Sequence, residues 1–546
     1  MTQNNFNIQT HPSQYRHWRL EIQGSVAWLF MQVQEDAGVR PGYQLKLNSY
    51  DIGVDFELAD AVNRLRFEHP EVKVVCIESG RQDIFCAGAN IYMLSQSSHS
   101  HKVNFCKFTN ETRIHIEEAT KESGQTYVAS LNGGTAGGGY ELALACHEIF
   151  LINDRKSAVS LPEVPLLGVL PGTGGLTRLV DKRKVRRDLA DIFCTTAEGV
   201  RGEKALKWGL VDHVYPPSQY KEKVEERIQE LLREDNCPRP EKGITLEPLV
   251  RESTDTGWKY SFLKVEIDGR EAILRFSGPR EEDLEIPSDP AEKGSSWYPL
   301  ALWREFWDAL WSLKLNYEEV GLVSIYSEGD LESILALDEE LWKRREHWFI
   351  REILLHMRRV LRSMDITSKS FYTFIIPGSC FGGSLFEIAL ASDRIYMLDH
   401  PDEPNYIGLS SLNQGFLTMY HGLSRLENRF YENPQALEGV WQYLGKPLSP
   451  LQAEELGLVT EVMDDIDWDD EIRVAREERL SLSPDALTGM EANLRFVGPE
   501  TMESRIFGRL SAWQNWIFTR PNATGPKGAL TCYGKAENPE FDWRRT

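Results

Sequence analysis

The stretch that decides the fold of this 546-residue chain is Thr126-Tyr-Val-Ala-Ser-Leu-Asn-Gly-Gly-Thr-Ala-Gly-Gly-Gly-Tyr-Glu141. A short, mostly apolar run leads into a glycine-rich loop, and a helical pattern begins near Glu141. Glycines let backbone N–H groups approach a ligand closely, and the first turn of a helix adds unpaired donors at the positive end of its dipole. The stretch therefore predicts a strand, an anion-holding loop and a helix.

The anionic group at this loop could be a phosphate or an oxyanion that forms during a reaction. A dinucleotide-binding loop has the spacing Gly-x-Gly-x-x-Gly, followed by an acidic residue about 20 positions later. The run Gly137-Gly138-Gly139 lacks this spacing. A Rossmann-type site is therefore disfavoured.

A second loop of small residues, Ala87-Gly88-Ala89-Asn90, lies upstream and follows an apolar run at 72–77 that predicts a strand. Two such loops can direct their N–H groups at one oxygen, which is the geometry that stabilises an enolate or a tetrahedral oxyanion. Taken alone, each loop is also typical of an ordinary tight connection.

Short apolar runs alternate with longer helical patterns on both sides of these loops. Residues 52–67 predict a helix, and residues 220–233 predict a charged helix with a solvated face. The polar residues 97–101 predict a mobile loop. Strands separated by helices indicate an α/β fold with a largely parallel sheet.

The chain also contains an internal repeat. Residues 141–152 recur at 387–398, which is 246 positions later. Three further pairs keep nearly the same separation and the same order: 22–24 with 267–269, 176–179 with 423–426, and 209–211 with 457–459. Such repetition indicates a tandem duplication. We predict a catalytic domain at 1–255 and a diverged, structural or oligomerisation domain at 256–546, joined through the charged stretch near 220–254.

Together, these motifs resemble the crotonase (enoyl-CoA hydratase/isomerase) superfamily. Its pattern consists of an Ala-Gly-Ala-Asp-like loop, then Asn-Gly-x-x-x-Gly-Gly-Gly-x-Glu, then Pro-Glu-x-x-x-Gly-x-x-Pro-Gly-x-Gly-Gly. The chain matches it at 87–90, 132–141 and 162–175. The resemblance implies a tandem-duplicated α/β fold of the ClpP/crotonase type, with the second copy diverged.

The resemblance also implies the roles of the site residues. The amides of Ala89 and Gly138 would form the oxyanion hole for the thioester carbonyl of an acyl-CoA. Glu141 and Glu163 would stand where hydratases keep their acid/base pair, in which one carboxylate activates water and the other, with a raised pKa, delivers a proton. The remaining loop positions would contact the substrate: Ala87, Gly88, Asn90, Gly137 and Gly139.

Each of these side chains also has a purely structural interpretation. Glu141 could be an exposed acid in the first turn of a helix, favoured by the dipole, and Glu163 could be a solvated loop residue. Cys106 is a further catalytic candidate, because the resemblance places a pocket-lining thiol there. Its alternative is an inert core cysteine, which is the commoner case.

Over its whole length the chain looks like the benzoyl-CoA-dihydrodiol lyase family of the aerobic benzoyl-CoA pathway. A single-domain hydratase would end near Pro217. The resemblance implies that 2,3-epoxy-2,3-dihydrobenzoyl-CoA and two waters become 3,4-dehydroadipyl-CoA semialdehyde and formate, with no metal or redox cofactor. The alternatives are an enoyl-CoA hydratase or acyl-CoA hydrolase that uses the same glutamates, and a non-catalytic crotonase-fold scaffold or RNA-binding relative.

The second copy keeps the carboxylates of Glu387 and Glu403 but not the donors. Ser384 stands where Gly138 would be, and residues 327–333 contain no Ala-Gly-Ala loop. Loss of the oxyanion hole removes what is usually the largest catalytic contribution. We therefore expect one active site per chain, in the first copy.

Composition excludes several classes of function. Lys and Arg number 61 against 83 Asp and Glu, a net charge of −22 that disfavours nucleic acids and anionic membranes as partners. The apolar stretch 371–391 is interrupted by glycines and predicts a buried strand, a turn and a helix rather than a membrane span. The phosphates of CoA must then meet a local basic surface, for which Lys46, Arg81 and the run 182–187 are candidates.

Cysteine usage and the N-terminus bear on location. Eight cysteines form no Cys-x-x-Cys pair and no zinc-binding spacing. Residues 1–10 show no basic cluster followed by an apolar stretch, so they do not predict a leader peptide. These features favour a reduced, cytoplasmic protein. Duplicated members of the superfamily still associate, and we expect a homodimer.

Overall fold

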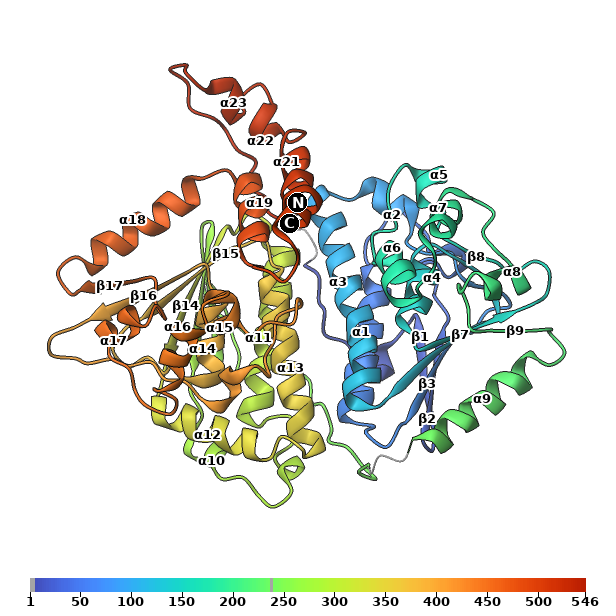
Figure 1. Cartoon of the computed structure of the whole chain (residues 1–546), viewed down its shortest axis with the longest axis horizontal. Coiled ribbons are helices and arrows are strands. Elements are labelled where there is room, and N and C mark those ends of the chain that lie inside the picture. The colour runs from blue at the N-terminus through green and yellow to red at the C-terminus, as the bar shows by residue number, and fades with distance from the viewer. Residues whose placement is uncertain (1–4, 236–238) are drawn as a thin grey trace. The chain divides into compact units, whose positions relative to one another are not determined.

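The structure is a computed structural model that describes residues 5–235 and 239–546. It contains two compact units, Met1–Leu246 and Glu247–Thr546 (Figure 1). Cys237 and part of the predicted linker lie outside the described residues. No helix in the described part of the chain is both long enough and apolar enough to cross a lipid bilayer.

The main sheet of unit 1 starts with an antiparallel hairpin and continues with parallel strands. In spatial order the strands are β1 (Trp18–Gln23), β2 (Val26–Met31), β3 (Val74–Ser79), β5 (Thr126–Leu131), β7 (Glu148–Ile152) and β9 (His213–Tyr215). A smaller parallel sheet consists of β4 (Asp83–Cys86), β6 (Gly133–Ala136) and β8 (Val159–Ser160). The predicted α/β class with a largely parallel sheet is confirmed.

Helices connect the strands of unit 1, and α1 and α3 lie side by side (Figure 1). The helices are α1 (Ile52–Phe67), α2 (Ile91–Gln96), α3 (His99–Glu118), α4 (Gly138–Ala145), α5 (Glu163–Leu167), α6 (Gly175–Thr177), α7 (Arg187–Thr195), α8 (Gly202–Lys207) and α9 (Tyr220–Glu234).

Local capping chemistry explains where these helices start. Asp51 accepts a hydrogen bond from the Gly53 N–H at 2.9 Å, so α1 begins at the residue after it, as predicted. The prediction of a loop over 97–101 is wrong for residues 99–101, which belong to a helix. Ser98 accepts from the His101 N–H at 3.1 Å and caps α3, which begins at His99. The polar residues form a helix cap rather than a longer loop.

Helix α9 belongs to the core of unit 1 and is not a connecting segment. Tyr220, Val224, Ile228 and Leu231 are buried and pack against the sheet strands. The other face carries exposed charges, as its sequence pattern predicts. The charged residues of α9 therefore lie on the outer face of a helix whose inner face is packed against the sheet.

Unit 2 repeats the strand connections of unit 1. An antiparallel hairpin, β12 (Leu263–Asp268) with β13 (Glu271–Ser277), is again followed by parallel strands. The hairpin turns contain Gly24 and Gly269, with φ of 60° and 55°. The remaining strands are β10 (Glu252–Ser253), β11 (Gly257–Lys259), β14 (Leu322–Glu328), β15 (Ser370–Ile375), β16 (Arg394–Asp399) and β17 (Glu461–Asp464).

The predicted strand, turn and helix at 371–391 are confirmed as β15 and α14 (Gly383–Leu390). The other helices of unit 2 are α10 (Glu281–Leu284), α11 (Tyr298–Asn316), α12 (Leu331–Lys343), α13 (Trp348–Asp365), α15 (Arg425–Arg429), α16 (Pro434–Trp441), α17 (Pro450–Glu455), α18 (Trp468–Ser481), α19 (Pro484–Leu494), α20 (Met502–Arg505), α21 (Ser511–Ile517), α22 (Pro521–Thr524) and α23 (Ala529–Cys532).

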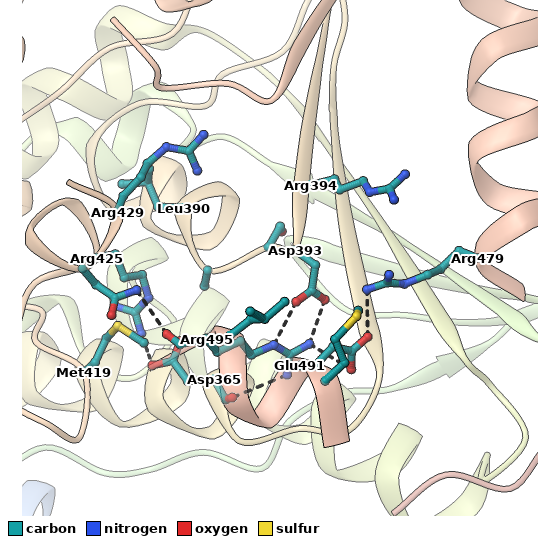
Figure 2. A pocket seen from close by; sticks show the side chains of 15 residues that line it. Asp365, Leu390, Asp393, Arg394, Met419, Arg425, Arg429, Arg479, Glu491 and Arg495 are labelled. Atoms are coloured by element: carbon teal, nitrogen blue, oxygen red, sulfur yellow. Dashed lines mark hydrogen bonds and ion pairs between the residues drawn. The ribbon is translucent and has the colours of Figure 1, made fainter. Parts of the chain in front are cut away.

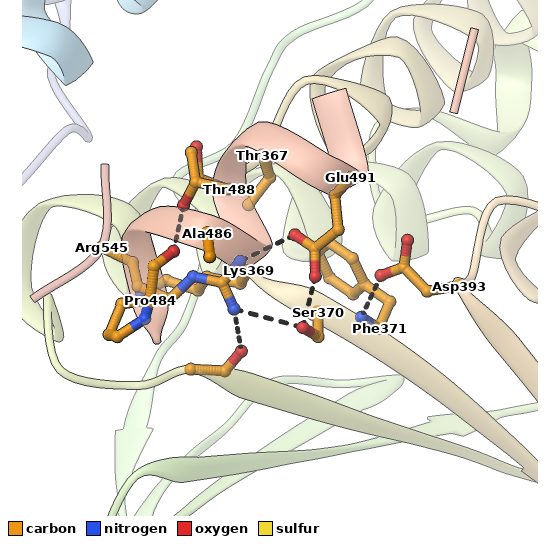
Figure 3. A network of polar contacts seen from close by, with 12 residues as sticks. Thr367, Lys369, Ser370, Phe371, Asp393, Pro484, Ala486, Thr488, Glu491 and Arg545 are labelled. Carbon is orange, nitrogen blue, oxygen red and sulfur yellow. Dashed lines mark hydrogen bonds and ion pairs between the residues drawn. The ribbon is translucent and has the colours of Figure 1, made fainter. Parts of the chain in front are cut away.

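A buried ionic network fixes the C-terminus of unit 2 against its sheet (Figure 3). Arg545 donates to the Gly321 carbonyl at 2.8 Å, to Ser370 Oγ at 3.1 Å and to Glu491 Oε2 at 2.7 Å. Arg479 donates to the other oxygen of Glu491 at 2.9 Å. Because these groups are buried, loss of one member leaves an uncompensated charge in the core.

We expect Arg545→Ala to lower the free energy of unfolding of unit 2 by about 3–5 kcal/mol, because it leaves Glu491 short of one buried partner. The matched control is Arg544→Ala, since Arg544 forms an exposed pair with Asp542 and should contribute about 0–1 kcal/mol. Urea unfolding of the full chain measures both. Equal losses for the two variants would contradict this account.

Candidate active site

The two small-residue loops leave the same end of the small sheet. Strands β4 and β6 run parallel, with Asp83 opposite Gly133 and Cys86 opposite Thr135. Their carboxyl ends therefore deliver the 87–90 loop and the start of α4 side by side. Gly88 has φ of +88°, and a Cβ there would lie 2.9 Å from the Ala136 carbonyl oxygen and 3.0 Å from the Gly138 nitrogen. Only glycine permits this approach.

The Ala89 and Gly138 amides have no hydrogen-bond acceptor among the described residues. Neighbouring amides do have acceptors. The Ala87 N–H donates to the Leu47 carbonyl at 3.1 Å, and the Asn90 N–H donates to the Tyr50 carbonyl at 2.8 Å. Two unpaired donors on adjoining, rigid loops are suited to hold an oxyanion.

Other predicted contact residues shape these loops. The Asn90 side chain accepts from the Met93 N–H at 2.9 Å and donates to the Gln44 carbonyl and to Ser49 Oγ, so its amide group is committed to holding the loop. A Cβ on Gly139 would lie 2.6 Å from the Cys86 Cβ, so glycine is required there for packing. Ala87 is half-buried beside them.

Glu141 is buried on α4 and is not the exposed acid of the structural alternative. Its carboxylate accepts from the Thr173 N–H at 3.0 Å, the Gly175 N–H at 2.7 Å and the Thr173 hydroxyl. The third motif, at 162–175, thus folds back over Glu141 and sets the orientation of its carboxylate.

Glu163 begins α5 and lies against the glycine loop that precedes α4. A Cβ on Gly137 would be 2.7 Å from Glu163 Oε1, and Oε2 is buried with no hydrogen-bond partner among the described residues. Burial, with a smaller contribution from the charge of Glu141, raises the pKa of Glu163 to about 7. The two glutamates therefore have different environments, which is what an acid/base pair requires.

Cys106 lies on α3 and faces the third motif. A Cβ on Gly172 would be 3.3 Å from the Cys106 sulfur, and Asn110 Nδ2 donates to the Gly172 carbonyl at 3.0 Å. Burial raises the pKa of the Cys106 thiol to about 11. Near neutral pH the group is a neutral thiol, and this does not favour a nucleophilic role.

Tyr50 was missed by the sequence reasoning. Its hydroxyl is buried with no partner among the described residues, and a Cβ on Gly138 would collide with it. Burial raises the pKa of Tyr50 well above its ordinary value, so the group stays a neutral phenol. Its location follows from the bridge between Tyr50 and Ala89, which no local sequence signal indicates.

Unit 2 fills the corresponding position with one of its own carboxyl groups. The Ser384 N–H, at the place of Gly138, donates to Asp338 Oδ2 at 2.6 Å, and the Ser384 hydroxyl donates to Asp338 Oδ1 at 2.9 Å. Burial raises the pKa of Asp338 to about 7. Glu387 accepts from Asn413 at 2.8 Å.

The expectation that Glu403 is the counterpart of Glu163 is wrong. The bridge Val159–Val200 of unit 1 corresponds to Ile407–Leu448 in unit 2, so Ser411 lies at the place of Glu163 and Glu403 is exposed in the preceding loop.

The candidate CoA-binding cations are mostly paired within unit 1. Lys182 contacts Glu117 at 2.9 Å, and Arg183 contacts Asp212 at 2.8 Å. Arg81 contacts Glu35 at 2.8 Å. Lys46 is exposed beside the first loop. Lys184 and Arg187 are exposed as well, and neither of them nor Lys46 has an ion pair among the described residues. These three cations are therefore available to an incoming anion.

Two convergent loops on a small parallel sheet, with paired glutamates, define an enoyl-CoA hydratase/isomerase domain, and the sequence pattern of that family matches residues 44–238. Over 541 residues the chain is 52% identical to the benzoyl-CoA-dihydrodiol lyase of Aromatoleum evansii, covering 99% of this chain and 98% of that protein. The chain belongs to the benzoyl-CoA-dihydrodiol lyase family.

More distant relatives match only part of the chain. The fatty acid oxidation complex subunit alpha of Idiomarina loihiensis is 33% identical over 208 residues, which cover 38% of this chain and 28% of that protein. The solved enoyl-CoA hydratase of Thermoplasma volcanium GSS1 is 25% identical, with a TM-score of 0.33, over 40% of this chain and 79% of the other.

The raised pKa of Glu163 predicts a pH-dependent stability difference. Folded protein holds this proton up to about pH 7, whereas the unfolded chain releases it near the ordinary value of 4.5, so stability is lost as the pH rises between these values. Glu163→Gln removes this pH-dependent loss of stability, because glutamine does not titrate. The variant should therefore gain stability relative to the wild type as the pH rises from 4.5 to above 7, measured by urea unfolding.

Glu403→Gln is the control, because Glu403 is an exposed glutamate in a loop of unit 2. Its stability difference from the wild type should not change with pH in this range. A Glu163→Gln difference that is equally flat would mean that the Glu163 carboxyl titrates as it does in the unfolded chain.

Proposed function

We propose that the chain hydrolytically opens the ring of 2,3-epoxy-2,3-dihydrobenzoyl-CoA, giving 3,4-dehydroadipyl-CoA semialdehyde and formate. The observation that carries the proposal is the convergence in unit 1 of two unpaired amides with two glutamates in different environments. Similarity to a benzoyl-CoA-dihydrodiol lyase along 99% of the chain supports an aromatic acyl-CoA as the substrate class.

In the proposed mechanism, the thioester oxygen lies between the Ala89 and Gly138 amides. These donors stabilise the negative charge that the oxygen gains as ring electrons shift toward it. Because the donors are fixed by the loops before substrate binds, little reorganisation is needed when the charge develops. The oxyanion hole therefore lowers the barrier for breaking bonds in the ring.

The two glutamates divide the proton transfers. Glu141 has a carboxylate oriented by Thr173 and Gly175 and would accept a proton from the attacking water. Glu163, with a pKa of about 7, would deliver a proton to the epoxide oxygen as its C–O bond breaks. The overall reaction consumes two water molecules, whose atoms are incorporated into the semialdehyde and formate products.

The active site would lie in unit 1 alone. Support comes from Asp338, which occupies the donor at Ser384 in unit 2. A substrate oxygen would have to displace a buried carboxyl group that makes several hydrogen bonds, including one from Ser410 at 3.0 Å. Unit 2 would then have a structural or oligomerisation role. The expected homodimer and cytoplasmic location stay predictions.

The proposal is tested by incubating the protein with 2,3-epoxybenzoyl-CoA and, separately, with crotonyl-CoA. Mass spectrometry should detect formate and the semialdehyde from the first substrate. Hydration of crotonyl-CoA without any formate from the epoxide would identify a plain hydratase and refute the proposal. Absence of both reactions would favour a non-catalytic scaffold.

We expect Glu141→Gln and Glu163→Gln each to lower the rate of formate release by about 100-fold or more, because each removes one proton transfer. Glu403→Gln should retain the wild-type rate, since its carboxylate is exposed in unit 2. Initial rates with 2,3-epoxybenzoyl-CoA measure all three. Full activity in either unit 1 variant would exclude that glutamate from the chemistry.

A further inference from the structure

Unit 2 contains a cavity of about 340 Å³ whose wall is rich in arginine. Five arginines and three carboxylates line it, together with apolar and small polar residues (Figure 2). A volume of this size is within the range of small-molecule sites. The cavity lies wholly in unit 2 and shares no residue with the site in unit 1.

Three of the five arginines are neutralised by the three carboxylates. Figure 2 shows these contacts as dashed lines. Arg425 contacts Asp365 at 2.6 Å, Arg495 contacts Asp393 at 2.8 Å, and Arg479 contacts Glu491 at 2.9 Å. Arg425 also contacts Glu387 at 3.3 Å, and Glu491 also contacts Arg545 at 2.7 Å. These two further charges cancel, so the formal charge that remains is that of the other two arginines.

Arg429 is the first unmatched cation. Its Nε donates to the Gly457 carbonyl at 2.6 Å, which fixes the guanidinium, and no carboxylate of the described residues lies within ion-pair distance of it. Burial lowers the pKa of Arg429, and no neighbouring negative charge opposes this. A buried guanidinium without an anion is costly unless a ligand supplies one.

Comparison with unit 1 shows that unit 2 lacks a carboxylate beside this arginine. Arg183 is the counterpart of Arg429, because its Nε donates to the Gly209 carbonyl at 2.9 Å just as Arg429 donates to Gly457. In unit 1, Asp212 neutralises Arg183 at 2.8 Å and also accepts from the Ile149 N–H.

Thr460 occupies the place of Asp212 in unit 2. Its hydroxyl accepts from the Ile395 N–H at 2.9 Å, so the backbone contact is kept and the negative charge is gone.

Arg394 is the second arginine without a carboxylate within ion-pair distance among the described residues, although the charge of Glu478 acts on it from farther away, and it reverses the charge of its counterpart. Its position in β16 corresponds to Glu148 in β7, which pairs with Arg227 in unit 1 at 2.7 Å. Arg394 instead donates to the Tyr396 hydroxyl at 3.0 Å, with its guanidinium 5.2 Å from the centre of the Tyr372 ring. Both changes leave the wall more positive than in unit 1.

We propose that this cavity binds a small phosphate-bearing molecule, with the phosphate held by Arg429 while Arg394 adds to the positive potential of the wall. A phosphate dianion matches the two surplus positive charges of the wall, and a guanidinium can donate two parallel hydrogen bonds to it. The site would be separate from acyl-CoA turnover in unit 1.

The test uses the full chain and isothermal titration calorimetry with inorganic phosphate and with pyrophosphate, at constant ionic strength in sodium chloride. Succinate is a parallel probe that carries two negative charges on carboxylates. The wild type should bind at least one of the two phosphate compounds at a single site. Binding of succinate alone, or of none of the probes, would overturn the proposal.

The decisive variants are Thr460→Asp and Thr460→Asn. Aspartate restores the counter-ion that unit 1 has and should weaken phosphate binding by about tenfold or more, because Arg429 then has an internal partner. Asparagine has the same shape without the charge and should bind as the wild type does. Equal affinity in both variants would contradict the role of Arg429.

Arg429→Gln provides a second route that does not depend on the new carboxylate, and it should also lose binding by about tenfold or more. Thermal unfolding without ligand establishes that each variant is folded before titration. No acyl-CoA is present in any titration, so the outcome is independent of whether the proposed ring-opening reaction takes place.

Discussion

The candidate active site of this protein depends on the close approach of two backbones at Gly88 and Gly138. Parallel pairing of β4 and β6 brings the two loops to the same edge, and the missing side chain of Gly88 lets them touch. Any larger residue at position 88 would meet the Ala136 carbonyl and the Gly138 nitrogen. Glu163 lies against Gly137 and Tyr50 lies against Gly138, so both side chains border this contact.

The two units show how one fold changes use through the placement of charges. In unit 1 the helix start at Gly138 is open, whereas in unit 2 Asp338 binds the corresponding amide at Ser384. The opposite change occurs at the buried arginine, which has Asp212 in unit 1 and only Thr460 in unit 2. In the functions proposed above, a carboxylate gained in unit 2 closes one anion site, and a carboxylate lost there opens another.

Local chemistry explains why much of this was predictable from sequence. The spacing of glycines around Gly138, the helix over 52–67 and the strand over 126–131 are properties of short segments, and the structure has them at the predicted residues. The environment of Glu163 was not predictable, since its pKa depends on burial by residues from other elements. The same holds for Tyr50, Asp338 and Arg429, whose surroundings are formed by residues distant in sequence.

The sequence by itself determined the α/β class, the repeat at 246 positions and the family, because these rest on motifs and periodicity that are written along the chain. Only the tertiary structure decided which charged groups are paired. Ion pairs and desolvation act through space between residues such as Arg183 and Asp212, so their balance exists only after folding. For that reason the net charge of −22 conceals a cavity with surplus positive charge.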